Sequence, residues 1–315
     1  QLTPAIIAKA NELGRQPLPI YQWVRNTVKF APTYGSIQGS DYLLKTREGN
    51  AYDQASLLIA LLRASGISAR YVYGTVEIPV AQARNWLGNV TTAEAALQLL
   101  GQGGVPAVGI IQGGAITHIQ MEHVWVEAYV DYIPSRGSRH VTGDTWIAMD
   151  PSFKQFDYLE PIKPSDATTL DMSQYLAALQ STGEVDAGAG WARDLAHDAS
   201  NIQISNALTA YRNFLDVQDA PLSEITGGRA VHAQTAPYLA ATLPYPVNSV
   251  ATRWTELPAS LRWSFEYRID GTSLLSRGLP TLAGSQIAVS FEPASAADAN
   301  LLRSYLPGAV DDLGD

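Results

Sequence analysis

The sequence predicts an α+β fold in which a helix packs on an antiparallel sheet, followed by a helical segment and a small β-rich region. Three observations support this prediction. An apolar stripe at helical spacing runs through residues 51–66. Alternating or β-branched strand patterns occupy the stretches 69–77, 122–131 and 145–149. After residue 160 the pattern first becomes mostly helical and then β-like again.

Composition indicates a globular protein. Of the 315 residues, 46% are apolar and 16% are charged, and the formal net charge is −9. This length allows two or three domains. No basic run or stripe is present, so we expect no nucleic-acid partner. The chain has no cysteine, which excludes disulfides, zinc–thiolate sites and a thiol nucleophile in the chain as written.

The two ends suggest a piece of a longer chain. The sequence opens with Gln1, shows no signal-peptide pattern, and ends in an acidic stretch, 310–315, that resembles a cut. No apolar run is long enough to span a bilayer. We therefore expect a soluble fragment without a membrane segment.

The first fifty residues predict two helices and a turn. Thr3 can cap a helix that continues to about Leu13, and Pro17 and Pro19 are expected to break it. A second helix is predicted over 21–28. The stretch 34–41 is rich in turn residues.

The helix predicted from Ala51 is the best-defined element in the sequence. Asn50 is a plausible N-cap, and Asp53 stands where a carboxylate reaches back to the cap. Gly66 ends the helix. The apolar face is formed by leucines one and four residues apart: Leu57, Leu58, Leu61 and Leu62.

Three predicted strands follow. In the second, over 122–131, the side chains of His123, Trp125, Glu127 and Tyr129 alternate with those of small apolar residues. A hairpin across 134–143 leads to the third strand, which ends at Asp150. Between the first and second strands we expect a helix over 92–100 and a Gly-rich turn, 101–104, which lacks the lysine of a phosphate loop.

The rest of the chain is predicted as two regions. Residues 161–240 form a mostly helical segment, clearest over 204–215. Residues 241–315 form a small β-rich region that is expected to be truncated, with strands over 261–269 and 286–291 and a closing helix over 294–305. The first domain then covers 1–160.

The order helix start, His123, Asp150 is the layout of a thiol acyltransferase. A nucleophile in the first turn of a helix lies in the positive end of the helix dipole, which favours a thiolate. A histidine on a neighbouring strand can move the proton. An acid on the next strand can fix the histidine tautomer.

Three blocks of this sequence resemble the bacterial transglutaminase-like superfamily. The stretch 49–72, Gly-Asn-Ala-Tyr-Asp-Gln-Ala through Gly-Ile-Ser-Ala-Arg-Tyr-Val, is similar to its Gly-x-Cys motif, apolar helix and Gly-Ile-Pro-Ala-Arg ending. His-Val-Trp-Val-Glu at 123–127 resembles its histidine strand. Trp-Ile-Ala-Met-Asp-Pro-Ser at 146–152 resembles its Trp…Asp-Pro strand.

The resemblance implies a papain-like fold with a Cys–His–Asp triad, no cofactor and no metal. Carried over by position, the cysteine falls on Ala51, the histidine on His123 and the aspartate on Asp150. Alanine supplies no nucleophile, so the chain as written is expected to be inactive. Two explanations remain open: a natural variant that lost its nucleophile, or an engineered replacement of the native cysteine.

Other residues receive weaker roles. Gln38, upstream of Ala51, and Trp125 are candidates for an oxyanion-hole donor and a groove wall. Asp53 is expected to be a helix-cap acid rather than a substitute nucleophile. His118, Glu122 and His123 do not match a zinc-protease pattern, so no metal site is expected.

Two functions follow. The first is a nucleophile-free module, a pseudoenzyme, that binds a peptide or scaffolds neighbouring domains of a large secreted or surface bacterial protein of the Rhs/YD-repeat type, which the segment also resembles. The second is a cysteine protease or transglutaminase-type acyltransferase that acts on a peptide or protein substrate and whose native cysteine was changed to Ala51. A third, weaker alternative places the function after residue 240.

Overall fold

Helix α4 (Ala51–Ala64) lies at the centre of the fold, as its leucine stripe predicts. The computed structural model describes residues 2–167, 170–218, 225–290 and 292–305. The Asn50 side chain accepts a hydrogen bond from the Asp53 N–H at 2.9 Å and so caps the helix. All four predicted leucines are fully buried.

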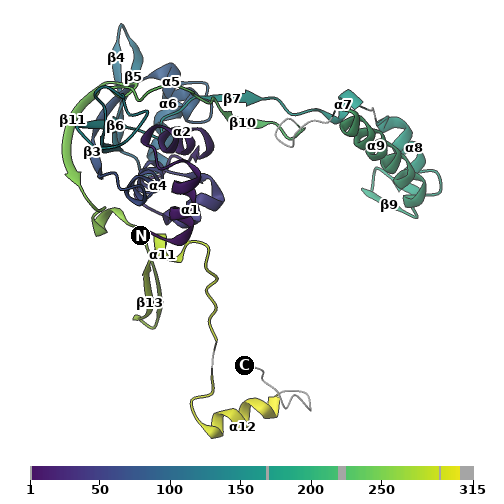
Figure 1. The fold of residues 1–315 in the computed structure, drawn as a ribbon. Coiled ribbons are helices and arrows are strands. Elements are labelled where there is room, and N and C mark those ends of the chain that lie inside the picture. The colour runs from purple at the N-terminus through teal and green to yellow at the C-terminus, as the bar shows by residue number, and fades with distance from the viewer. Residues whose placement is uncertain (1, 168–169, 219–224, 291, 306–315) are drawn as a thin grey trace.

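Five further helices surround α4 and the sheet in Figure 1: α1 (Pro4–Glu12), α2 (Pro17–Thr27), α3 (Ser40–Thr46), α5 (Val80–Trp86) and α6 (Ala93–Gln102). The first three pack on α4, while α5 and α6 pack on the strands. The sequence predicted α1 and α6 closely. Pro17 opens α2, earlier than predicted, because proline is compatible with the first helical position. Helix α3 lies partly in the stretch predicted as turns, and α5 was not predicted.

The central sheet is antiparallel and has the order β11-β3-β5-β4, with β6 also paired to β5. Its strands are β3 (Ala69–Pro79), β4 (Ala107–Gln112), β5 (Ala115–Val130), β6 (Thr145–Met149) and β11 (Val247–Trp254). Strand β5 is longer than predicted, so its first half pairs with β4 and its second half with β6. The bounds of β6 are those predicted, whereas β4 was not predicted. A two-residue parallel pair, β1 (Lys29–Phe30) and β2 (Glu48–Gly49), precedes α4.

Strand β11 comes from the region that the sequence separates from the first domain. It pairs antiparallel with β3, with Val250 opposite Gly74 and Trp254 opposite Tyr71. The break in sequence character near residue 240 is therefore not a break in the sheet. The edge of the core sheet is completed by β11, which begins 98 residues after the end of β6.

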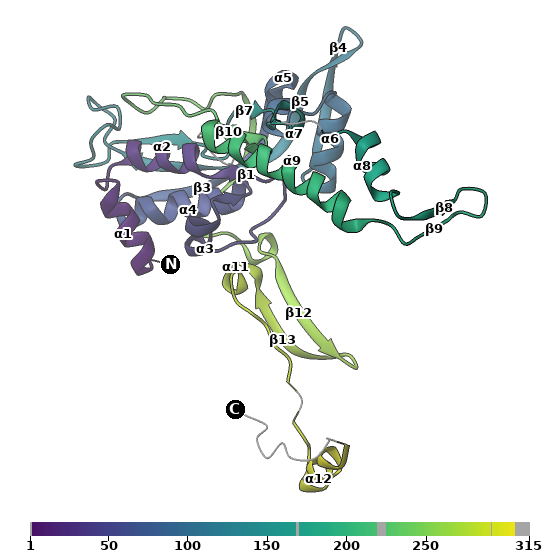
Figure 2. The same cartoon turned by 90° about the vertical axis from the view of Figure 1, so that its right-hand side faces the viewer.

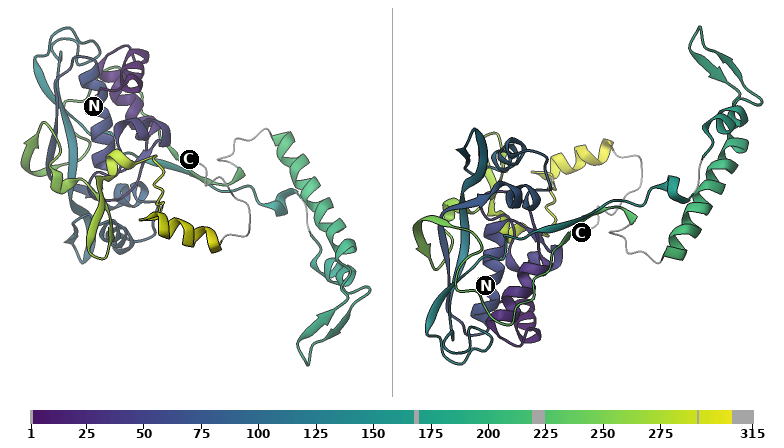
Figure 3. Two further views of the ribbon diagram at one scale, coloured as in Figure 1. Left: turned by 90° about the horizontal axis from the view of Figure 1, so that it is seen from below. Right: turned by 90° about the horizontal axis from the view of Figure 1, so that it is seen from above.

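Residues 156–231 leave the core and return to it. Strand β7 (Phe156–Leu159) pairs antiparallel with β10 (Gly228–Val231), and this ladder joins the core to a helical group, as Figures 1 and 3 show. The group contains α7 (Pro164–Ala167), α8 (Met172–Leu179), the hairpin β8 (Glu184–Asp186) and β9 (Trp191–Arg193), and α9 (His197–Gln218). Helix α9 contains the stretch 204–215 that the sequence predicts most clearly as helical, whereas strands β8, β9 and β10 of the same region were not predicted.

The C-terminal part extends from the core as a hairpin (Figure 2). It contains η1 (Ala259–Leu261), β12 (Ser264–Ile269), β13 (Thr272–Gly278), α11 (Leu279–Leu282) and α12 (Ala296–Tyr305). The closing helix and β12 are as predicted. The strand predicted over 286–291 is wrong for residues 286–290, which pair with no strand. Residue 291 and the acidic end, 310–315, lie outside the described residues. Within the described ranges, no helix is both long and apolar enough to cross a membrane.

Candidate active site: a buried histidine–aspartate pair

The structure brings His123 and Asp150 into direct contact. Nε2 of His123, on β5, lies 2.9 Å from Oδ2 of Asp150, which immediately follows β6. The two side chains are 2% and 0% exposed. Since β5 and β6 are paired up to Val126 and Met149, the sheet itself places the aspartate beside the histidine.

Three further groups hold the Asp150 carboxylate. The Tyr245 hydroxyl donates to Oδ2 at 2.6 Å, and Ser152 donates to Oδ1 from its hydroxyl at 2.6 Å and from its backbone N–H at 2.8 Å. Burial alone would raise the pKa of Asp150, but His123 and these hydrogen bonds outweigh it and lower the pKa to about 2. Asp150 is therefore a carboxylate at neutral pH.

Aromatic rings fix the plane of the His123 imidazole. The Trp86 and Tyr245 rings contact it edge-on, with centroids at 5.7 and 6.1 Å. Trp86 is held in turn by its indole N–H, which donates to the Ser152 carbonyl at 2.8 Å. Nδ1 of His123 has no hydrogen-bond partner among the described residues. The pair is thus an oriented base whose second nitrogen is unengaged.

Ala51 is the first residue of α4, and it is 6% exposed. Helix α4 packs on β5, the strand that carries His123. The first turn of α4 is also tied to the loop after Asp150, since Lys154 Nζ donates to the Gln54 side-chain carbonyl at 2.9 Å. Gln54 in turn donates to the Gly49 carbonyl at 2.8 Å. Ala51, His123 and Asp150 therefore belong to elements that are packed and hydrogen-bonded together.

Asp53, in the first turn of α4, is hydrogen-bonded to the preceding loop and not to the histidine–aspartate pair. One of its oxygens, Oδ1, accepts hydrogen bonds from the Ser36 hydroxyl and from the N–H groups of Ile37 and Gln38 at 3.0–3.1 Å. The other, Oδ2, is buried without a partner among the described residues. Burial raises the pKa of Asp53 to about 6, although the hydrogen bonds oppose the shift. The carboxylate thus anchors the loop 36–38 to the helix start.

Gln38 and Trp125, the other two predicted site residues, have separate surroundings. The Gln38 amide donates to the Glu48 carbonyl at 2.8 Å and accepts from the Thr46 hydroxyl at 2.9 Å. It would have to leave Glu48 to serve an oxyanion. Trp125 is 2% exposed and lines a cavity of about 670 Å³ together with residues 241–247.

His118 lies apart from the histidine–aspartate pair. Its Nδ1 lies 3.9 Å from a Glu77 carboxylate oxygen. Among the described residues, no group of three or more His, Asp or Glu side chains could hold a metal ion.

Three site residues were not predicted from the sequence: Ser152, Tyr245 and Trp86. Ser152 had a local signal, because a serine two residues after an aspartate commonly closes a turn by bonding its carboxylate. Tyr245 and Trp86 had none, since they reach the site only through the packing of β11 and α5.

The part of the chain that carries this site matches a known protein family. Residues 1–151 match the family model described as the Transglutaminase-like superfamily. This part of the chain is therefore a transglutaminase-like domain with an α+β core, as its sequence motifs indicate. No curated protein and no solved structure matches the chain.

Proposed function

We propose that the chain is a transglutaminase-like module without a nucleophile, which binds a peptide or scaffolds neighbouring domains of a larger secreted or surface protein. Ala51 stands at the nucleophile position, and His123 and Asp150 remain as its former partners. A bacterial protein of the Rhs/YD-repeat type is the context that the sequence resemblance suggests.

The observation that carries the proposal is the 2.9 Å contact between His123 and Asp150. It lies beside helix α4, whose first residue is Ala51. The pair has the orientation of a general base, yet Ala51 offers no atom that could be deprotonated. The chain also has no cysteine elsewhere that could replace the missing thiol.

The burial of the site supports a non-catalytic role. Ala51 and His123 are 6% and 2% exposed, and neither lines the cavity beside Trp125. Tyr245, contributed by a segment far along the chain, packs edge-on against the His123 ring and adds to its burial.

The second candidate is a thiol acyltransferase or peptidase whose native cysteine was replaced by Ala51. The observation that favours it is the unengaged Nδ1 of His123. This nitrogen is free to accept a thiol proton while Nε2 stays on Asp150. A cysteine thiolate at residue 51 would attack the substrate carbonyl, and His123 would return the proton to the amine that leaves. Water or an acceptor amine would then cleave the acyl-enzyme.

The test is alkylation of an Ala51→Cys variant by iodoacetamide between about pH 5 and 9, with and without His123→Ala. No other thiol can react, because the chain has no cysteine. The matched control is Ser65→Cys, which places a thiol at the opposite end of α4, away from the positive end of the dipole.

The module proposal expects the introduced thiol to be unreactive, or to titrate like an ordinary thiol near pH 8.5 as in the Ser65→Cys control. Rapid alkylation well below that pH, lost with His123→Ala, would instead support the acyltransferase. The native coding sequence at codon 51 then distinguishes a natural from an engineered alanine.

A further inference from the structure

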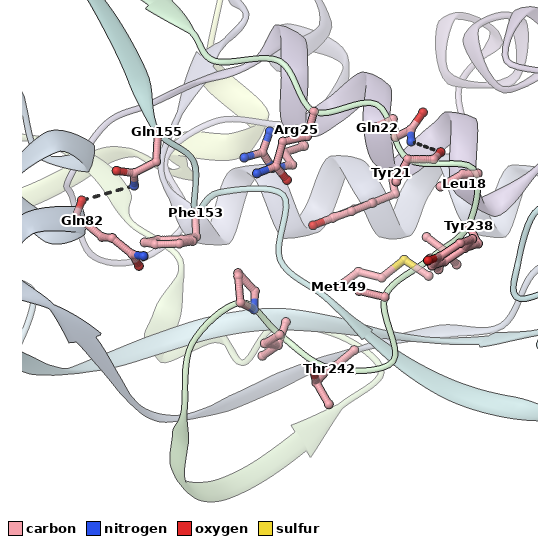
Figure 4. A pocket seen from close by; sticks show the side chains of 17 residues that line it. Leu18, Tyr21, Gln22, Arg25, Gln82, Met149, Phe153, Gln155, Tyr238 and Thr242 are labelled. Atoms are coloured by element: carbon pink, nitrogen blue, oxygen red, sulfur yellow. Dashed lines mark hydrogen bonds between the residues drawn. The ribbon is translucent and has the colours of Figure 1, made fainter.

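A second cavity has a volume of about 450 Å³. It lies near Asp150, since its lining includes Met149 and also Tyr21, whose hydroxyl donates to the Asp150 carbonyl at 3.2 Å. One wall is a face of α2, formed by Leu18, Tyr21, Gln22 and Arg25 at helical spacing (Figure 4). A further part of the lining comes from residues 234–244, which return from the helical group to the core. This volume lies within the range of small-molecule sites.

The cavity is a built feature of the fold, because hydrogen bonds fix its covering segment on both sides. Gln22 donates to the Ala236 carbonyl at 2.7 Å, and Asn26 donates to the Gln234 carbonyl at 2.8 Å. Further along, the Leu239 N–H donates to the Arg136 carbonyl at 2.9 Å. The segment therefore roofs a preformed space.

Arg25 is the charged group in this wall. The residue is 5% exposed, and its Nη1 donates to the Asn26 side-chain carbonyl at 3.0 Å and to the His232 carbonyl at 3.3 Å. Its Nε and Nη2 hydrogens have no acceptor among the described residues. None of the described carboxylates lies within ion-pair distance of it.

This positive charge has no ion-pair partner among the described residues, and the Asp150 charge acts on it only from beyond salt-bridge distance. The lining of the cavity contains no aspartate or glutamate. The nearby buried carboxylate, Asp150, is already held by His123, Ser152 and Tyr245. Burial lowers the pKa of Arg25 more than the charges of Tyr21 and Asp150 raise it, because neither forms an ion pair with the guanidinium. A bound anion would offset the cost of this burial.

We propose that the cavity binds an organic carboxylate with an apolar body, whose carboxylate pairs with the free edge of Arg25. The apolar part would lie against Leu18, Met149 and Phe153. Gln82 and Gln155 also line the cavity and would offer their amides to polar groups of the ligand. A free small acid and a peptide C-terminus share this chemistry. The site is separate from Ala51 and does not depend on the proposed function.

The experiment is isothermal titration of the full chain with N-acetyl-phenylalanine and with its neutral amide. Because a charge-assisted pair is lost with the amide, the carboxylate is expected to bind roughly 10- to 100-fold more tightly. Arg25→Met should abolish this preference. The control Arg63→Met removes a guanidinium that also bonds backbone carbonyls, of Ala69 and Thr255, but lies outside the cavity, and it should leave the preference intact.

Two further arms make the test decisive. Ala240→Trp fills the cavity from its exposed covering segment and should block binding even if Arg25→Met does not fold. 3-Phenylpropanoate and N-acetyl-Ala-Ala-Phe identify the source: equal affinities indicate a small acid, and tighter binding of the tripeptide indicates a peptide end. Equal binding of acid and amide, undiminished binding to Ala240→Trp, or no binding up to about 10 mM would overturn the proposal.

Discussion

Two buried carboxylates near the site behave in opposite ways. Asp150, at the end of β6, and Asp53, in the first turn of α4, are each 1% exposed. Yet the pKa is lowered to about 2 in Asp150 and raised to about 6 in Asp53. Both acids lose water on burial to a similar extent, so burial does not explain the difference.

The partners explain it. Asp150 faces His123 and has donors on both of its oxygens. Asp53 has three donors on one oxygen; among the described residues its other oxygen has none, and no cation contributes to its pKa. A partner that can carry charge therefore lowers the pKa of a buried carboxylate below its ordinary value, whereas neutral donors on one oxygen do not offset the effect of burial. By this measure Asp150 belongs to a charge-handling site and Asp53 to the scaffold.

The largest expected effect is that of Asp150→Ala. It leaves His123, Ser152 and Tyr245 buried without their acceptor, so the free energy of unfolding should fall by about 3–5 kcal/mol. Urea unfolding at pH 7 measures it. The control is Asp157→Ala, which removes an exposed aspartate that pairs with the exposed His232 and should change stability by less than about 0.5 kcal/mol. Equal losses in the two variants would show that the pair at Asp150 is not buried and coupled as described.

Asp53 should make the free energy of unfolding depend on pH. The folded-state pKa of Asp53 lies above its ordinary 3.8, so folding favours the protonated form. The stability that Asp53 contributes is present below about pH 4 and is lost as the pH rises through about 6, in total about 3 kcal/mol. Comparison of wild type with Asp53→Asn from pH 4 to 8 should show this decline in the wild type alone.

Asp150 should show the opposite slope. Because its folded-state pKa of about 2 lies below 3.8, its contribution is present above about pH 4 and disappears as the pH falls towards 2. The difference in stability between wild type and Asp150→Ala should therefore shrink in acid. A difference that grows in acid would contradict the opposition between the two sites.

A smaller effect is expected from Tyr245→Phe. It removes a hydrogen bond from a buried hydroxyl to the Asp150 carboxylate and should cost about 1.5–3 kcal/mol. Tyr238→Phe, on the same segment but without a hydrogen bond from its hydroxyl among the described residues, is the control and should cost much less. Similar small losses in both would mean that the segment around 245 does not support the site.

The smallest effect is expected from Gln38→Ala. Its side-chain hydrogen bonds are exposed and reach only Glu48 and Thr46, so the loss in the free energy of unfolding should stay below about 1 kcal/mol. A larger loss would show that Gln38 supports the start of α4 more strongly than its contacts indicate.

The parts of the fold that could be predicted are those with local physical causes. Asn50 caps α4 because its side chain reaches the N–H of Asp53, and the leucines follow at helical spacing, so both signals lie within one short stretch. His123 and Asp150 lie on adjacent strands joined by a hairpin, which brings them together without any distant segment.

The parts that could not be predicted depend on distant contacts. Nothing around Tyr245 indicates that this segment returns to cover Asp150, because the return requires the pairing of β11 with β3. Residues 286–290 have a strand-like pattern but no partner strand, and a pattern without a pairing edge does not form a strand. Arg25 has no sequence signal, because its unusual feature is burial without an ion-pair partner among the described residues, and this exists only in the folded chain.

Asp150 orients His123 as a base whose Nδ1 has no hydrogen-bond partner among the described residues. The tautomer of His123 tests this arrangement most directly. Long-range ¹H–¹⁵N NMR of the five histidine side chains, with His123→Gln to assign the signal, distinguishes the two ring nitrogens at a pH where imidazoles are neutral. We expect a proton on Nε2, donated to Asp150, and an unprotonated Nδ1. A proton on Nδ1 would contradict it.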